Sequence, residues 1–285
     1  MSIDLHTHTT ASDGSLTPSQ LVRYAKQKGL TVIAITDHDT TDGNGEAMAE
    51  GRHQEIVVVP GVEISVDHTP GSMHMLGYFI DIESAGLKEK LHLLQDSRAD
   101  RNPRIIEKLN ALGVSITYQE VIEVSGGGQV GRPHIAQVLM QKGYTKGIQE
   151  AFDRYLGKGA PAYFDKFRLE PAQAIGMITD AGGVAVLAHP FTLNCTTSHL
   201  EGLVEELISL GLQGIEVYYT EHSLKQVSCY ESLVKRYNLI ATGGSDFHGA
   251  NTEGIDLGRG RGGLHIPYEL FEKLKNRSEG KSSVC

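Results

Sequence analysis

Short runs of aliphatic and β-branched residues recur along the chain, and each is bounded by Gly, Pro, Asp or His. Such runs are typical of buried strands, which we predict at residues 3–5, 31–36, 56–59, 72–79, 183–188, 214–218 and 239–242. Amphipathic helical stretches alternate with many of them. The first has Thr17 as N-cap and Pro18 at the first helical position, and others cover residues 171–181, 200–210 and 223–237. This alternation predicts an α/β fold with a mainly parallel sheet or barrel.

The middle of the chain breaks this alternation. Strand patterns nearly vanish between residues 86 and 168, where helical patterns follow one another at 99–112, 118–124, 133–142 and 148–155. A chain of 285 residues permits one large domain with a sizeable insertion. We therefore predict an α/β domain formed by residues 1–85 and 169–276, a helical insertion at 86–168 that covers the active site, and a flexible polar tail at 277–285.

The chain is acidic and rich in histidine. Its formal net charge is −9, and it contains 13 histidines and no tryptophan. A net negative protein is a poor partner for duplex DNA. The charge does not exclude an anionic substrate, because bound metal ions can make a single pocket positive. Many histidines in an acidic chain raise metal binding as an interpretation.

The cysteines and the apolar segments bear on the compartment. The three cysteines form no CxxC pair, which favours reduced thiols in a cytoplasmic protein. No apolar run reaches the roughly 18 residues that a membrane span requires. The first residues lack the basic and then apolar pattern of a secretory signal. We expect a cytoplasmic protein without a membrane partner, and the sequence leaves the oligomeric state open.

Potential metal ligands gather where the predicted strands end. His6 and His8 close the first strand, and Asp246 and His248 close the last. Residues two apart in an extended segment point the same way, so each pair can face one centre. Four further strands bring, in turn, the segment Thr36-Asp37-His38-Asp39, then Glu63, His74 and His189. Functional sites of barrels and open α/β sheets form at this edge.

The convergence of these residues predicts a metal site. One such histidine is more often a packing residue, but several neighbouring ionisable groups cannot be buried without compensation. Divalent cations supply that compensation. Imidazole and carboxylate ligands suit manganese, zinc and iron. The ligands outnumber the needs of one ion, which indicates more than one metal with Glu63 as a bridging carboxylate.

An ordered set of motifs resembles a known family. His6-Thr7-His8, Asp13-Gly14, Thr36-Asp37-His38-Asp39, Gly61-Val62-Glu63-Ile64, His189-Pro190 and Ser245-Asp246-Phe247-His248 look like the motifs of the polymerase and histidinol phosphatase (PHP) superfamily. The resemblance extends from residue 2 to about residue 260. The helical insertion and Gly131-Arg132-Pro133-His134 resemble its branch of nucleoside 3′,5′-bisphosphate phosphatases, TrpH-like phosphoesterases and 5′–3′ exoribonucleases.

The resemblance implies a distorted (β/α)7 barrel, the PHP barrel, with a trinuclear metal site. It implies that His6, His8, Glu63 and Asp246 hold the first metal. Glu63, His74 and His189 would hold the second, and Asp13, His38 and His248 the third. Asp13 enters only through the resemblance, because a residue before Gly14 otherwise indicates a turn. We expect manganese first, with zinc or iron as alternatives.

Basic residues of the insertion are the candidate substrate contacts. Arg101-Asn102-Pro103-Arg104 is predicted to begin a helix, with Asn102 as N-cap and Pro103 at the first helical position. A helix N-terminus flanked by arginines attracts anions, although a solvated charged face is the alternative from the residues alone. The resemblance implies that this segment contacts a second phosphate of the substrate, with Arg132 and His134 as similar contributors.

The predicted function is hydrolysis of a phosphomonoester of nucleoside 3′,5′-bisphosphates by a metal-activated water. The catalytic candidates are His189, His248 and Asp13, assigned first as ligands. Three alternatives stay open. These are a 5′–3′ exonuclease acting on short RNA 5′ ends, a phosphatase of the histidinol-phosphate type, and a non-catalytic metal-binding module. A complete ligand set disfavours the last.

Overall fold

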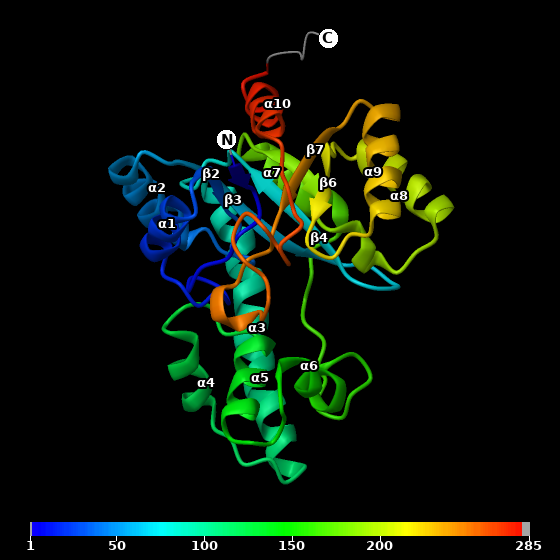
Figure 1. Cartoon of the computed structure of the whole chain (residues 1–285). Helices are drawn as coiled ribbons and strands as arrows, with labels where there is room; N and C mark the ends of the chain where they lie inside the picture. The colour runs from blue at the N-terminus through cyan, green and yellow to red at the C-terminus, as the bar shows by residue number, and fades with distance from the viewer. Residues whose placement is uncertain (1, 281–285) are drawn as a thin grey trace.

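A nearly closed barrel forms the centre of the protein (Figure 1). The computed structural model describes residues 2–280. Within them one sheet has the order β1 (Ser2–Asp4), β2 (Leu30–Ile35), β3 (Val57–Val66), β4 (Met73–Tyr78), β5 (Val184–Leu187), β6 (Gly214–Tyr219) and β7 (Ile240–Gly244). The last strand returns to the first, because the Leu5 amide donates to the Gly243 carbonyl at 3.1 Å and Thr7 bridges Phe247 in parallel. The predicted α/β barrel is confirmed.

The barrel is distorted where β4 runs against its neighbours. β3 pairs in parallel with β2 through residues 57–60 and antiparallel with β4 through residues 61–66. β4 is also antiparallel to β5, and the remaining neighbours are parallel. Only residues 67–72 join β3 to β4, which is too short for a crossover helix. The prediction that this strand ends near residue 60 is therefore wrong, and Glu63 lies inside β3.

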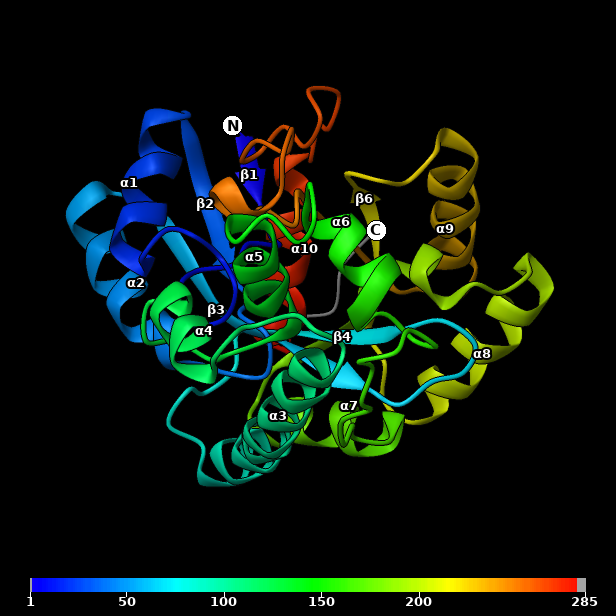
Figure 2. The ribbon, with the colours of Figure 1, turned by 90° about the horizontal axis from the view of Figure 1, so that it is seen from below.

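Helices cover the outside of the barrel (Figures 1 and 2). They are α1 (Pro18–Gln27), α2 (Asp42–Gln54), α7 (Pro171–Asp180), α8 (Thr197–Ser209), α9 (Leu224–Arg236) and α10 (Tyr268–Ser278). The predicted cap of α1 is present, since the Thr17 side chain accepts from the Gln20 amide. The sequence reading missed α2, whose apolar face is weak and which contains three glycines. α10 continues two residues past the predicted start of the tail, and residues 281–285 lie outside the described part.

The insertion has a core of its own. It comprises α3 (Ala85–Ala111), α4 (Tyr118–Ser125), α5 (Arg132–Gln141), α6 (Ile148–Ala151) and a single π-helical turn, η1 (Phe152–Leu156). Ile105, Leu109, Val121, Ile135 and Leu139 are buried together, apart from the cores of the barrel. In Figure 1 these helices extend below the barrel, and Figure 2 shows them in front of one of its ends.

The long helix α3 corrects one prediction. It begins after Ser84, whose side chain accepts from the Leu87 amide, and Pro103 lies in its interior. Leu87, Leu91 and Leu94 form a buried stripe on the turns before the proline. Burial of this stripe continues the helix through a residue that usually begins one. Residues 101–104 are therefore not a helix N-terminus, so no helix end can contribute to an anion site there.

Short 3-10 turns, η2 (Pro190–Leu193) and η3 (Gly249–Asn251), follow the ends of β5 and β7. None of the helices among residues 2–280 is long and apolar enough to cross a membrane.

Closure of the barrel between β7 and β1 predicts a specific sensitivity at Gly244. A Cβ there would overlap the Cβ and the backbone nitrogen of His6, which cannot rotate away. We expect Gly244→Ala to lower the free energy of unfolding by about 1–3 kcal/mol, the usual cost of overpacking. Urea denaturation followed by circular dichroism measures this.

The matched control is Gly45→Ala inside α2, where an added Cβ meets no atom within 4 Å. This change should raise stability by about 0.4–1 kcal/mol. Equal unfolding free energies for Gly244→Ala and the wild type would show that the β7–β1 contact tolerates a side chain.

Candidate metal centre

Nine acidic and histidine side chains meet at the barrel end that faces the insertion. His6 and His8 follow β1, and Asp246 and His248 follow β7, so closure of the sheet places the two pairs side by side. His74 lies near the start of β4 and reaches the same end because that strand is reversed. The remaining members are Asp13, His38, Glu63 and His189. The structure thus brings together all of the predicted ligands.

The first group has the spacing of a metal site. The Nε2 atom of His6 lies 3.2 Å from Glu63 Oε2 and 3.4 Å from Asp246 Oδ1. The Nε2 atom of His8 lies 3.3 Å and 3.0 Å from the same two oxygens. Tetrahedral bonds of about 2.1 Å separate ligand atoms by about 3.4 Å. These four side chains match the set that the family resemblance implies for the first metal.

The other two groups share residues with the first. Glu63 Oε1 lies 2.7 Å from His74 Nδ1 and 2.9 Å from His189 Nε2, while Oε2 lies 3.0 Å from His38 Nδ1. Asp13 Oδ1 lies 3.3 Å from His248 Nε2 and 3.9 Å from His8 Nδ1. His38 therefore stands between the predicted second and third sites, and His8 reaches the third as well as the first.

Orphaned polar atoms test whether these residues suit a cation. Both ring nitrogens of His8, His38 Nδ1 and Asp246 Oδ1 are buried and form no hydrogen bond, although His8 Nε2, His38 Nδ1 and Asp246 Oδ1 lie close to groups of opposite charge. Unpaired buried groups of this kind are costly. Nitrogen and carboxylate oxygen donors are ligands for manganese, zinc and iron, so bound divalent cations would satisfy all four atoms. The residues present fit a metal cluster.

The charge states agree with this interpretation. Burial alone would raise the pKa of Glu63, but the His38, His74 and His6 rings hold it well below its usual value. Burial lowers the pKa of His38 to about 3. Glu63 is therefore ionised and His38 neutral at neutral pH, the forms that bind metals. Despite its burial, His8 has a pKa raised to about 10 by Asp246 and Glu63, so metal binding there would displace a proton.

Two ligands have unusual backbone conformations. His189 has φ 22° and Asp246 has φ 57°, in the region that side chains other than glycine rarely adopt. Such conformations cost about 1–3 kcal/mol and persist where surrounding contacts enforce them. For His189 the enforcing contact is a buried hydrogen bond, which its backbone N–H donates to Glu216 Oε2 at 2.8 Å.

Glu216 is a support that the sequence reading missed. It lies on β6, is fully buried, and its Oε1 stands 2.9 Å from His6 Nδ1. An acceptor at Nδ1 leaves His6 Nε2 free to face the carboxylates, the usual arrangement behind a metal-bound histidine. Tyr219 on the same strand donates to Asp246 Oδ2 at 2.8 Å. A lone acid within the apolar run Gly214–Tyr219 was the signal available in the sequence.

Asp37 fixes the loop that carries Asp13. Its Oδ1 accepts from the Thr9 amide at 2.7 Å and from the Ser12 hydroxyl at 2.6 Å, and its Oδ2 accepts from the Thr9 hydroxyl at 2.7 Å. All three oxygen contacts are buried. Asp37 therefore positions the loop, whereas its neighbour His38 faces the cluster.

A cleft lined by cations opens beside the cluster. Asp13, His38 and His74 form one side, and the lining includes Arg98, Arg101, Arg132, Lys166 and Arg168. Arg98 forms an ion pair with Asp39, and Lys166 Nζ lies 3.2 Å from the same carboxylate. Arg98, Lys166 and Arg168 were missed by the sequence reading. The last two lie in the short basic segment that leads from the insertion back to the barrel.

The predicted substrate contacts separate into three groups. Arg101 and Arg132 line the cleft. Asn102 and His134 are buried, with the Asn102 amide donating to the Val130 carbonyl at 2.8 Å and His134 Nδ1 accepting from the Gly131 amide at 3.0 Å. Arg104 is exposed, and its guanidinium lies 4.5 Å from the centre of the Phe164 ring. It lines a different hollow, because α3 continues through Pro103 and turns Arg104 away from the cleft.

The PHP domain family matches residues 4–164, more than half of the chain, and the chain belongs to that family. Together with the geometry of the cluster, this membership makes the protein an enzyme of the metal-dependent phosphoesterase class.

Its relatives match over nearly the whole chain. A 3′,5′-nucleoside bisphosphate phosphatase from Chromobacterium violaceum is 33% identical over 96% of this chain and 97% of its own length. The 5′-3′ exoribonuclease Rnm of Escherichia coli is 33% identical over 97% of this chain and 96% of its own. A solved structure of a metal-dependent phosphoesterase from Bifidobacterium adolescentis superposes with a TM-score of 0.88 at 28% identity, covering 96% of each chain.

Glu216 leads to a prediction about metal affinity. Glu216→Gln keeps the shape of the side chain but leaves one acceptor oxygen. Two acceptors are needed, one for His6 Nδ1 and one for the backbone N–H of His189. We expect manganese affinity to fall about 10- to 100-fold, as is typical when such a partner is lost. Titration with chelator-buffered manganese, followed by elemental analysis, measures this.

Glu231→Gln is the control, because this carboxylate is exposed on α9 and, within residues 2–280, accepts a hydrogen bond only from the Tyr218 hydroxyl. A folded Glu216→Gln protein with wild-type manganese affinity would contradict the positioning role.

Proposed function

We propose that the protein hydrolyses a phosphomonoester of nucleoside 3′,5′-bisphosphates at a cluster of three metal ions, with manganese as the working metal. The observation that carries the proposal is the pair of buried or half-buried arginines, Arg101 and Arg132, that face the cluster across one cleft. A substrate with two phosphates would place one at the metal cluster and the other at the arginines. The bisphosphate phosphatase relative supports the same substrate class.

The metal side of the cleft would receive the phosphate that is hydrolysed. Bound divalent cations neutralise phosphate charge and lower the pKa of a coordinated water. The chain contributes the frame: Glu63 would bridge metal ions, and Asp13, which lines the cleft and whose Oδ1 lies 3.3 Å from His248 Nε2, would hold a metal together with His248. His248 Nδ1 lies 2.9 Å from the Asp246 carbonyl, which orients its Nε2 toward Asp13. His189 is held by its amide contact to Glu216.

The opposite side would hold the second phosphate. Among residues 2–280 no carboxylate forms an ion pair with Arg101 or Arg132. Arg101 donates to the Asn102 side chain, and Arg132 donates to the Leu156 carbonyl. Burial, followed by the charges of Arg132, Arg98 and Arg168, lowers the pKa of Arg101 to about 9. Crowded cations without a counter-ion favour a doubly charged anion between them.

Exonuclease activity on short RNA is the second candidate. A 5′ nucleotide followed by a phosphodiester offers the same two phosphorus groups as a bisphosphate. Arg101 also lines the neighbouring hollow with Arg104 and Phe167, and Phe167 is 49% exposed. An exposed aromatic ring beside arginines is suited to stacking an unpaired base. Histidinol phosphate is less well supported, because it lacks a second phosphate for the arginine pair.

The arginine pair yields a prediction that distinguishes binding of the second phosphate from hydrolysis of the first. Arg101→Ala should raise KM for adenosine 3′,5′-bisphosphate about 10- to 100-fold, since a charge-assisted contact contributes about 1.5–3 kcal/mol. KM for p-nitrophenyl phosphate should change little. Steady-state phosphate release measures both.

Arg104→Ala is the control from the same helix, and it should leave both KM values for these small substrates unchanged because Arg104 lies outside the cleft. An equal rise of KM for the two substrates in Arg101→Ala would remove Arg101 from the second-phosphate role.

A substrate panel decides between the candidate functions. With manganese, we expect adenosine 3′,5′-bisphosphate to release phosphate faster than AMP, 3′-AMP and histidinol phosphate. Faster turnover of a short 5′-phosphorylated RNA would favour the exonuclease. Full activity after chelation, with loss of metal verified by elemental analysis, would overturn both.

A further inference from the structure

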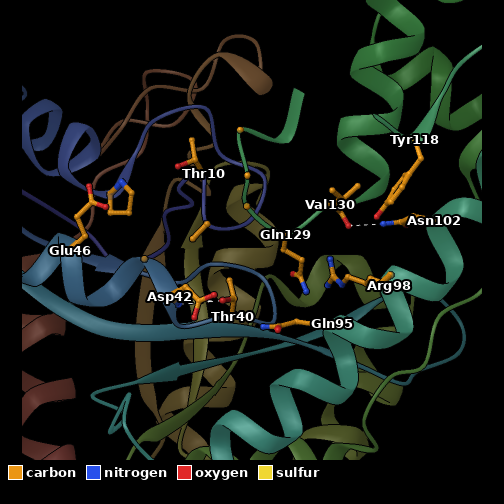
Figure 3. A pocket seen from close by; sticks show the side chains of 17 residues that line it. Thr10, Thr40, Asp42, Glu46, Gln95, Arg98, Asn102, Tyr118, Gln129 and Val130 are labelled. Atoms are coloured by element: carbon orange, nitrogen blue, oxygen red, sulfur yellow. Dashed lines mark hydrogen bonds between the residues drawn. The ribbon is translucent and has the colours of Figure 1, made fainter. Parts of the chain in front are cut away.

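A second pocket lies next to the metal centre, between α2 and the insertion (Figure 3). Its volume is about 510 Å³, within the range of small-ligand sites. We refer to it as the amide pocket, and its walls include Thr10, Asp42, Gln95, Arg98, Tyr118 and Gln129. Figure 3 shows Gln129 and Arg98 side by side on the insertion side, opposite Thr40 and Asp42.

The amide pocket adjoins the catalytic cleft. Arg98 lines both hollows, so its side chain lies between them. The loop before Gln129 is also attached to the segment between His8 and Asp13, because the backbone N–H of Gln129 donates to the Ala11 carbonyl at 3.0 Å. Gly128 lies against the Thr10 carbonyl so closely that a Cβ would overlap it. The pocket wall is therefore held at a set position relative to the cluster.

The chemistry of the wall suits a flat molecule with hydrogen-bonding edges. The oxygen and the nitrogen of the Gln129 side-chain amide are both buried, and neither has a hydrogen-bond partner. Arg98 Nε is likewise buried without a partner. An amide both donates and accepts, as the edge of a nucleobase does. Rotation of the Gln129 side chain about its own bonds would turn the amide to such an edge. The half-buried Tyr118 ring supplies an aromatic face.

The charges of the pocket argue against a phosphate. Asp42 and Glu46 are exposed at its α2 side, and Arg98 is the only cation among the described lining residues. The guanidinium of Arg98 is already engaged by Asp39. An anion in this pocket would face two carboxylates and one neutralised arginine. A neutral group, whose hydroxyls and amines can donate to the carboxylates, is favoured.

We propose that the amide pocket binds the nucleoside part of the substrate, with Gln129 reading the base edge and Tyr118 contacting the base face. This inference rests on the proposed function, since it takes the phosphates to lie in the adjoining cleft. It makes Gln129 and Tyr118 specificity determinants for a nucleoside rather than for a sugar phosphate.

Binding of adenosine to the full-length protein tests the pocket independently of catalysis. Isothermal titration calorimetry should show that wild type binds adenosine and that Gln129→Met weakens binding about 3- to 10-fold, because the amide is lost at constant size. Tyr118→Leu should weaken it as well. Gln119→Met is the control, since that exposed side-chain amide lies on α4 outside the pocket and donates to Glu123.

Kinetics then separate the two proposals. Gln129→Met should raise KM for adenosine 3′,5′-bisphosphate and leave KM for the base-free 2-deoxyribose 3,5-bisphosphate unchanged. Absence of adenosine binding, or equal binding by wild type and both pocket variants, overturns the nucleoside site even if hydrolysis proceeds. Gln129-dependent adenosine binding without hydrolysis of either bisphosphate overturns the proposed function and leaves a nucleoside site.

Discussion

Burial of one carboxylate, Glu63, is the constraint on which the site depends. It is 1% exposed, and its two oxygens lie within 3.3 Å of five imidazoles, those of His6, His8, His38, His74 and His189. A buried charge must be compensated, and an imidazole carries a compensating positive charge only while it is protonated. Cations complete the balance, so the same arrangement that would be costly in a bare protein becomes a strong metal site. Glu216 and Asp37 then hold the surrounding groups in place from behind.

The insertion supplies what the barrel lacks. Barrel side chains at the cluster are acids and imidazoles, whereas the cations of the cleft come from α3, α5 and the segment that leads to α7. Because the insertion has its own core, it presents these arginines from a rigid support. The same unit separates two hollows that share Arg98, one cationic and one with acidic residues at its edge. A nucleotide has the matching division into charged phosphates and a neutral nucleoside.

The sequence predicted an element correctly where neighbouring residues alone determine it, and wrongly where distant residues also contribute. Thr17 and Pro18 describe a helix start completely, because a cap involves residues within one turn. Pro103 carries the same local signal, but Leu87, Leu91 and Leu94 bury a stripe on the preceding turns and continue the helix. Arg104 lost its predicted place in the cleft for this reason. The reversed direction of β4 also had no local signature, since direction depends on strand pairing.

By itself, the sequence determined the α/β class and the residue types of the metal cluster, because strand periodicity and pairs such as His6 and His8 are properties of neighbouring residues. The choice of a barrel over an open sheet came from the resemblance to the family. Only the tertiary structure decided which charged and polar groups contact one another. It placed Glu216 behind His6 from a strand 210 positions away, and it set Arg98 between two hollows. Electrostatic compensation and hydrogen bonding act over a few ångströms in space, and residues that satisfy one another in this way need not be near in the chain.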